Sequence, residues 1–278
     1  MKHLLTIDFE DFWNNLLCKR EVDTWENDHL DGVIQEILES LRINNRTATF
    51  FVLGKTAERR PDLIKQIYED GHEIAIHTYS HHSLLTISPN ELNQDLQKCF
   101  HLLGKYDPIG FRAPMFTITK ENHGLMRIIH DAGFIYDSSI YPFTTHLANL
   151  PVFRKDFYYP SLDDFRIEDR ESGIIEIPLN VFGAGPIRYP ISGGFFSRVL
   201  PQLILSEMMS ASGRKIIVHY VHPWELASDI PDYEDTALAS LIGKYNVRNC
   251  LRRFQKNVKS LRFQSISSYL DALHLLGK

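Results

Sequence analysis

The 278-residue sequence has little cysteine, no long hydrophobic run and no strong excess of one charge. Its three cysteines, Cys18, Cys99 and Cys250, are odd in number and far apart, which argues against a disulfide framework or a cysteine-rich metal site. No stretch approaches the roughly 18 consecutive apolar residues of a membrane span, so we expect no integral membrane segment. The run before Asp8 is too short for the apolar region of a signal peptide, and we expect a cytoplasmic protein.

The charge balance argues against one class of partner. The formal net charge is −5 and the pI is about 6.2, so nothing attracts the whole chain to a polyanion, and we expect no nucleic-acid partner. Hydrophobic residues make up 44% of the chain and charged residues 23%, a globular composition that argues against disorder. We find no internal repeat, and the length fits one large domain over residues 1–278.

Short apolar runs alternate with helical patterns along most of the chain. About eight runs have the β-branched and aromatic composition of buried strands, such as Thr47–Leu53 and Ile216–Val221. Between them lie helix patterns, of which Ser88–Glu91 is a capping box. This order predicts an α/β fold, a distorted, TIM-like (β/α) barrel of about seven to eight strands whose active site lies at the C-terminal ends of the strands. Residues 142–172 show no clear period and are interpreted as an irregular insertion.

Two histidines four residues apart, in His77-Thr-Tyr-Ser-His81, are the first candidates for chemistry. They follow Glu73–Ile76, a short apolar run that predicts a strand ending at His77. Two imidazoles at this spacing can bind one metal ion. The chain has 13 histidines, and His72 and His82 lie close by, so the spacing alone leaves open a histidine-rich surface turn.

Polar side chains also follow four other predicted strands. In an extended chain, Asp8 and Glu10 point to one side and Asp11 to the other, while Tyr220 shares the side of His222. Acids that border a strand often only solvate a turn, and this alternative stays open. The residues at the five strand ends are Asp8 with Glu10 and Asp11, His77 with His81, Arg112, Asp137, and His222.

This set of side chains suits metal-assisted hydrolysis. A carboxylate and two histidines give zinc, or a similar divalent ion, three protein ligands and leave positions for water and a substrate oxygen. Such an ion polarises a carbonyl and makes water nucleophilic, while a second carboxylate takes the proton of the water. A protonated histidine from another strand can donate a proton to the departing amine. The sequence therefore predicts hydrolysis of an amide or an ester.

In these segments the sequence resembles the polysaccharide deacetylases, the NodB-type carbohydrate esterases that remove acetyl groups from sugars. The resemblance extends from residue 4 to about residue 225. The matching segments, in the order of the family motifs, are Thr6–Asp11, His77–His81, Arg112–Pro114, Asp137–Ser139 and His222.

The resemblance implies a role for each of these residues. By the Asp-x-Asp spacing of one branch, Asp8 is the catalytic base and Glu10 the metal carboxylate, with Asp11 as the alternative ligand. His77 and His81 are the metal histidines. The other implied roles are Arg112 as the residue that orients the base, the backbone N–H of Met115 as an oxyanion donor, Asp137 as part of the fourth motif, and His222 as the general acid.

The first motif lacks the adjacent aspartates and the glycine that are common in the family. In this respect the motif resembles those of exopolysaccharide-locus deacetylases and Asp-x-Asp-type peptidoglycan deacetylases. Gly193–Phe196, Arg198–Pro201 and His222–Glu225 also resemble the exopolysaccharide branch. The implied activity is removal of an acetyl group, N-acetyl above all, from a nucleotide-linked, lipid-linked or polymeric sugar of a cell-surface glycan or its precursor. Two alternatives stay open: an amidohydrolase of the same branch that opens a cyclic amide or ureide, and a non-catalytic carbohydrate-binding relative.

Overall fold

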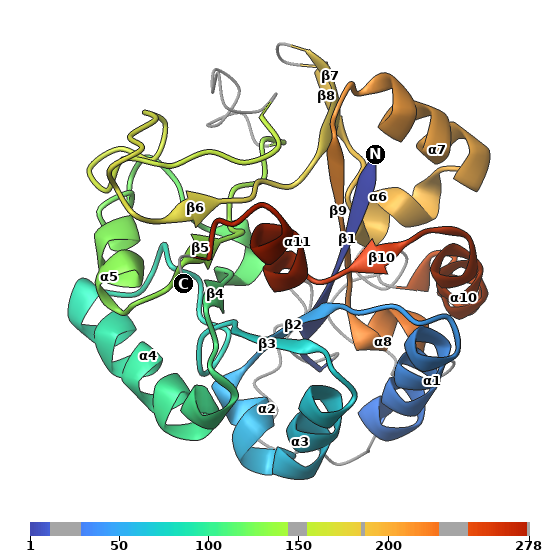
Figure 1. Ribbon diagram of the computed structural model, residues 1–278, viewed down its shortest axis with the longest axis horizontal. Helices are drawn as coiled ribbons and strands as arrows, with labels where there is room; N and C mark the ends of the chain where they lie inside the picture. Colours follow the sequence, from blue (N-terminus) through green and yellow to red (C-terminus); the bar gives the residue numbers. More distant parts are fainter. Residues whose placement is uncertain (12–28, 144–154, 185–186, 228–243, 277–278) are drawn as a thin grey trace.

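The computed structural model describes the whole chain except residues 12–28, 144–154, 185–186, 228–243 and 277–278. Within the described part, eight parallel strands form one curved sheet that is surrounded by helices (Figure 1). The strands are β1 (Lys2–Phe9), β2 (Thr49–Val52), β3 (Glu73–Ile76), β4 (Gly110–Phe111), β5 (Tyr136–Asp137), β6 (Ile175–Glu176), β9 (Ile216–Val221) and β10 (Phe263–Gln264). The predicted parallel (β/α) barrel of seven to eight strands is therefore confirmed.

The longest strand, β1, pairs with three other strands. Strand β9 pairs with residues 2–7 along one edge of β1. Because that edge is occupied, β10 at residues 3–4 and β2 at residues 6–9 share the other edge. From β2 the sheet continues in chain order through β3, β4 and β5 to β6. All these pairs are parallel, so the C-terminal ends of the strands meet at one end of the barrel.

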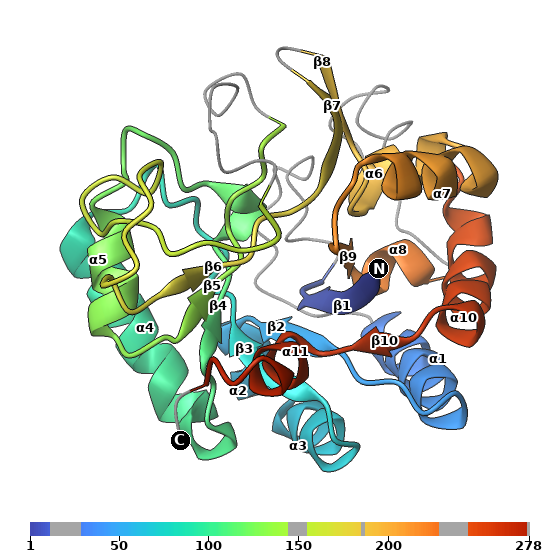
Figure 2. The ribbon, with the colours of Figure 1, turned by 45° about the horizontal axis from the view of Figure 1, so that its top comes forward.

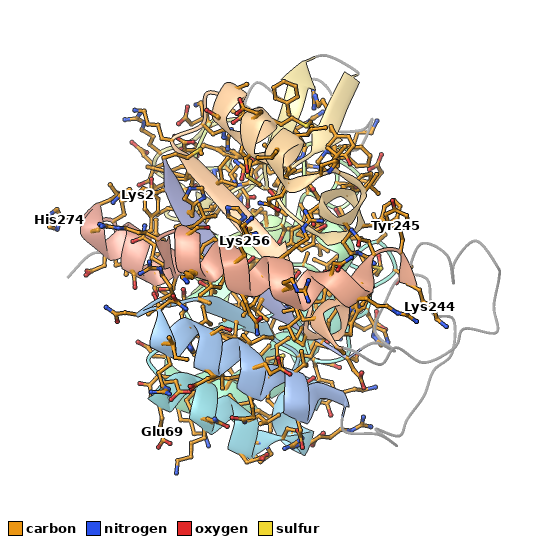
Figure 3. All side chains as sticks on the ribbon, turned by 90° about the vertical axis from the view of Figure 1, so that its right-hand side faces the viewer. Lys2, Glu69, Lys244, Tyr245, Lys256 and His274 are labelled. Carbon is orange, nitrogen blue, oxygen red and sulfur yellow. The ribbon has the colours of Figure 1, made fainter. Side chains whose placement is uncertain are left out.

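Helices connect the strands and cover the outer face of the sheet (Figures 1 and 2). Figure 3 shows α1 and α10 side by side on one flank, with Lys256 on α10 and Tyr245 beyond one end of it. None of the described helices is long and apolar enough to cross a membrane. The helices are α1 (His29–Ile43), α2 (Gly54–Arg59), α3 (Pro61–Glu69), α4 (Pro89–Leu103), α5 (Leu125–Asp131), α6 (Gly194–Val199), α7 (Gln202–Ala211), α8 (Pro223–Leu226), α10 (Cys250–Ser260) and α11 (Ile266–Ala272).

The barrel interior near the end where the strands begin is filled by apolar side chains. Leu4, Phe51 and Tyr136 pack there with Ile266 of α11, which lies across the middle of the ring in Figure 1. The carboxylate of Glu73 accepts hydrogen bonds from the Tyr136 hydroxyl at 2.7 Å and from the backbone N–H of Ser267 at 2.9 Å. Helix α11 therefore closes the end of the barrel where the strands begin and leaves the opposite end for chemistry.

The barrel is distorted between β6 and β9, which are not paired in the described structure. An antiparallel hairpin of β7 (Val181–Ala184) and β8 (Ile187–Pro190) stands beside this interval (Figure 2). The sequence analysis did not predict it, although the glycines and proline of residues 183–186 are a turn pattern.

Two predictions about segments are only partly covered by the structure. Part of the predicted insertion at 142–172 lies outside the described residues; residues 155–172 run past the sheet edge, where Tyr158 forms an antiparallel bridge with Glu176. Cys18 also lies outside them, whereas Cys99 and Cys250 are buried free thiols. Strands from both halves of the chain share one sheet, and a single domain over residues 1–278 stays a prediction.

Candidate metal centre

Strand alternation brings the candidate residues to the same end of the barrel. On β1, Leu4 packs in the barrel interior and Asp8 continues the same face, while Glu10 lies one residue beyond the strand and faces His81. On β9, Val218 packs in the interior, and Tyr220 and His222 follow on its side. The predicted orientations of Asp8 and Tyr220, which lie within these strands, agree with the interior packing.

Three side chains at this end could hold a metal ion. Ligand atoms of Glu10, His77 and His81 all lie within 4.8 Å of one another. Oε2 of Glu10 is buried and lies 2.6 Å from Nε2 of His81 and 4.0 Å from Nε2 of His77. A buried carboxylate oxygen facing two imidazole nitrogens is the donor set that zinc and similar divalent ions accept. The residues present therefore fit a bound metal ion.

The two histidines are prepared for coordination by their surroundings. Nδ1 of His77 lies 2.8 Å from the backbone oxygen of Arg112, so it carries the proton and leaves Nε2 as the metal-facing nitrogen. Burial lowers the pKa of His77 to about 4, which keeps the ring neutral at pH 7 as coordination requires.

The segment between the histidines is a bend and not a helical turn. Thr78 and His81 both have positive φ, 64° and 62°, a conformation that is costly for residues other than glycine. The strained backbone allows two side chains four residues apart to converge without a helix.

Asp8 is paired with a buried arginine beside this group. NH1 of Arg112 donates to Oδ1 of Asp8 at 2.6 Å, while Oδ2 lies 3.9 Å from Nε2 of His222. Burial alone would raise the pKa of the Asp8 carboxyl, but the charges of Arg112, His77 and His222 outweigh it and hold the pKa below its ordinary value. Asp8 is therefore ionised at neutral pH.

His222 approaches the same place from β9. Its Nε2 is 3.4 Å from Oε1 of Glu10, and its Nδ1 is 2.9 Å from Oε2 of Glu225. Burial would lower the pKa of His222, but the negative charges of Glu10, Glu225 and Asp8 raise it to about 9. The structure thus brings an ionised carboxylate and a protonated imidazole to the donor group from the neighbouring strands β1 and β9.

Three other residues that the sequence analysis predicted for the site lie outside the donor group of Glu10, His77 and His81. Asp11 is buried but does not belong to the donor group found among the described residues, so the geometry favours Glu10 as the carboxylate ligand. Met115 follows β4 with φ of 54°, inside a short 3-10 turn. Asp137 accepts a hydrogen bond from the Ser139 hydroxyl and pairs with Glu176 of the neighbouring strand, on the face of β5 opposite to Tyr136.

Several residues that the sequence analysis did not single out complete the site. The Arg112 guanidinium donates to the hydroxyls of Thr6 at 2.8 Å and Ser138 at 2.9 Å, and it lies 4.1 Å from the ring centroid of Phe51. The Trp224 ring stacks on His222 with centroids 5.2 Å apart, and its Nε1 is 3.4 Å from Glu10. Strand β5 is too short for alternation to indicate Ser138, and the partners of Trp224 depend on long-range packing.

Comparison with known proteins agrees with this geometry. Residues 17–134 match the family described as polysaccharide deacetylase, and residues 138–271 match a domain of unknown function, DUF3473. A peptidoglycan deacetylase-like protein from Gibberella zeae is 30% identical over 162 residues, which is 54% of this chain and 46% of that protein. A peptidoglycan-N-acetylglucosamine deacetylase from Bacillus cereus is 38% identical over 82 residues, 28% of this chain and 30% of that protein. The chain thus spans less than half the length of these relatives.

The fold is also shared with solved structures. A crystal structure assigned to the polysaccharide deacetylases, from Mycobacterium smegmatis, superimposes with a TM-score of 0.62 at 21% identity, covering 99% of this chain and 91% of that one. Residues 17–134 are thus similar to the polysaccharide deacetylase family, and the whole chain shares its fold with the structure from Mycobacterium smegmatis.

Proposed function

We propose that the protein is a metal-dependent hydrolase that removes an N-acetyl group from a sugar of a cell-surface glycan or its precursor. The observation that carries this proposal is the convergence of the Glu10–His77–His81 donor group, the Asp8–Arg112 pair and His222 at one barrel end. The relatives from Gibberella zeae and Bacillus cereus bear the names of peptidoglycan deacetylases, which supports a glycan substrate.

Zinc is the metal we propose, because two imidazoles and one carboxylate leave an open coordination position for catalysis. When bound, such an ion would polarise the acetyl carbonyl and lower the pKa of a water molecule, which could then lose a proton and attack the carbonyl near neutral pH. Glu10, His77 and His81 would hold the ion in this place.

The protons are moved by residues of the chain. Asp8 accepts the proton of the attacking water, and Arg112 keeps the Asp8 carboxylate ionised and oriented. His222 donates the proton on Nε2 to the sugar nitrogen as the carbon–nitrogen bond breaks, which releases acetate and the free amine. We assign the backbone N–H of Met115, which follows β4 at this barrel end, to the developing oxyanion. Asp137, with its side chain turned to Glu176 and Ser139, braces the Arg112 loop, because the Ser139 hydroxyl accepts from the backbone N–H of Ala113 at 2.7 Å.

The test is acetate release by the purified, zinc-loaded protein from nucleotide-linked, lipid-linked and polymeric N-acetyl sugars, with allantoin as a cyclic ureide. Acetate release that a chelator abolishes and zinc restores would support the proposal. Hydrolysis of the ureide without acetate release would favour a ring-opening amidohydrolase. Glycan binding with neither reaction would favour a non-catalytic carbohydrate-binding protein. Cytoplasmic location stays a prediction, which cell fractionation tests.

A further inference from the structure

The proposed general acid, His222, is held by side chains of residues 138–271, the region that matches a domain of unknown function. Its Nδ1 is 2.9 Å from Oε2 of Glu225, and the same carboxylate oxygen accepts from the backbone N–H of His222 at 3.3 Å. Two contacts to one oxygen prevent the ring from rotating freely. They also place the proton on Nδ1 and direct Nε2 toward Glu10 and Asp8.

The second oxygen of Glu225 is paired with an arginine from another element. Nε of Arg198, in α6, is 3.0 Å from Oε1 of Glu225, and the two side chains are only 4% and 5% exposed. NH1 of Arg198 donates to the backbone oxygen of Tyr245 at 3.0 Å, so the guanidinium is itself fixed in place. A carboxylate this deeply buried is costly without a compensating charge, and Arg198 supplies that charge.

We propose that Arg198 and Glu225 form a positioning arm for His222, which fixes the ring orientation and keeps Nε2 directed at the substrate. This inference rests on the proposed function, in which His222 is the proton donor. It gives a catalytic purpose to residues 138–271, the region that matches a domain of unknown function, because α6, β9 and α8 all lie within it. Among the described residues, the metal-donor group is reached from Glu225 through His222, and Arg198 in turn contacts Glu225, so both act through His222.

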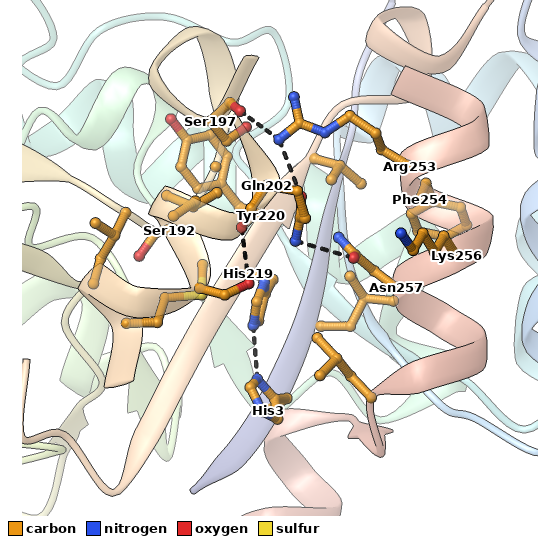
Figure 4. Close-up of a pocket in the computed structure, with 18 of the residues that line it drawn as sticks. His3, Ser192, Ser197, Gln202, His219, Tyr220, Arg253, Phe254, Lys256 and Asn257 are labelled. Carbon is orange, nitrogen blue, oxygen red and sulfur yellow. Dashed lines mark hydrogen bonds between the residues drawn. The ribbon is translucent and has the colours of Figure 1, made fainter. Parts of the chain in front are cut away.

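A cavity beside the arm makes the proposal testable by chemical rescue. It has a volume of about 370 Å³, lies between α6, β9 and α10, and is lined by Arg198 and Glu225 among others. Figure 4 shows its other walls, with Ser197 and Tyr220 on one side and Arg253 and Asn257 on the other. Truncation of Arg198 would open its site into this cavity, and a small guanidinium ion could then take the place of the lost side chain.

The variants are Arg198→Ala and Arg198→Lys, with Arg214→Ala as the matched control. Arg214 is also a buried arginine, 3.4 Å from Asp156 through Nε, and it precedes β9 at the end opposite to His222. We expect Arg198→Ala to lower kcat about 10- to 100-fold, as loss of a supporting partner typically does. The KM should stay within about twofold, because the arm does not bind substrate. Arg198→Lys should retain intermediate activity, and Arg214→Ala should lose stability with little change in kcat.

Methylguanidinium should restore the kcat of Arg198→Ala in a saturable manner and leave the wild type and Arg214→Ala unchanged. Nitrogen-15 NMR of labelled histidines, recorded at a pH high enough for the His222 ring to be neutral, gives a readout that needs no turnover: the Nδ1–H form of His222 should persist in Arg214→Ala and become a mixture in Arg198→Ala. The NMR result therefore separates failure of the arm from failure of the proposed function.

The proposal is overturned if Arg198→Lys and Arg198→Ala match Arg214→Ala in kcat. It is also overturned if the tautomer of His222 is unchanged when Arg198 is replaced.

Discussion

Arg112 donates a 2.6 Å hydrogen bond to the carboxylate of Asp8, although the two residues are 104 positions apart in the sequence. The same guanidinium bonds to Thr6 of β1 and to Ser138 just after β5. Both charged side chains are buried, so removal of either would leave the other uncompensated. The fold therefore fixes the position of the proposed base before any substrate binds.

The geometry predicts which first-motif carboxylate binds the metal. Glu10→Gln should weaken zinc binding by about 10-fold or more, because it removes one of three protein ligands. Asp11→Asn, the matched control, should bind zinc like the wild type. Isothermal titration of the metal-free proteins measures both. Equal affinity in Glu10→Gln and the wild type, with a loss in Asp11→Asn, would assign the ligand to Asp11.

His222 predicts an alkaline limit to activity. Nearby carboxylates raise the pKa of His222 to about 9 against the effect of burial, and a bound cation at Glu10 would lower it from that value. The protonated donor disappears as pH rises through this pKa, so kcat should fall on the alkaline side. His222→Ala should lower kcat by roughly 10²- to 10⁴-fold and remove this limb, with metal retained. The control is His82→Ala, which replaces an exposed histidine next to His81 in the sequence. An unchanged alkaline limb in His222→Ala would assign it to another group.

The buried carboxyl pair Asp137–Glu176 predicts a stability that falls with rising pH. Burial raises the pKa of Asp137 to about 6 and that of Glu176 well above its ordinary value. The folded state therefore binds more protons than the unfolded state, and this stability is present at low pH and lost as pH rises through the folded pKa values. Glu176→Gln removes one ionisable group and can still donate a hydrogen bond to Asp137.

Urea unfolding at pH 5 and pH 8 measures this effect. Glu176→Gln should be more stable than the wild type at pH 8, by about 1–3 kcal/mol at roughly 1.4 kcal/mol per pKa unit, and should gain less at pH 5. Glu171→Gln, at an exposed glutamate, is the control. A gain of equal size at both pH values would show that the carboxyl pair does not titrate in this range.

Gly193 predicts a steric requirement where the barrel is distorted. A Cβ at Gly193 would lie 1.9 Å from the backbone oxygen of Tyr220, with which Gly193 forms a parallel bridge. Gly193→Ala should therefore destabilise the protein by roughly 1–3 kcal/mol or more, since the contact is with backbone. A Cβ at Gly104 would meet nothing within 4 Å, so Gly104→Ala should leave the melting temperature nearly unchanged. Equal melting temperatures in the two variants would contradict this packing.

The sequence predicted the parts of the site that lie on long strands. On β1 and β9, alternation extends over six or more residues, so it determines which side chains face the barrel interior. Asp8 lies within β1 and faces the interior as predicted, whereas Glu10 and His222 each follow one residue after the end of their strand. Strand β5 has only two residues, and no alternating pattern determines its register. Asp137 consequently drew attention in the sequence, whereas Ser138 makes the contact with Arg112.

Other parts could not be derived from local patterns. The histidines converge through a strained bend at Thr78 and His81, which spacing alone does not distinguish from a helical turn. The ion pair between Arg198 and Glu225 joins α6 to α8, and long-range packing of this kind leaves no periodic trace in the sequence. Burial decides the pKa of His77, and burial is a property of the complete fold.

The most direct test measures zinc content and acetate release on the same preparations of three proteins: the wild type, Asp8→Asn and His77→Ala. The wild type should contain about one zinc ion and release acetate, since its three ligands are intact. Asp8→Asn should keep the metal and lose roughly 10²- to 10⁴-fold in kcat, because it lacks only the base. His77→Ala should lose both the metal and the activity. Near-wild-type kcat in Asp8→Asn, or equal zinc in His77→Ala and the wild type, would contradict the proposed mechanism.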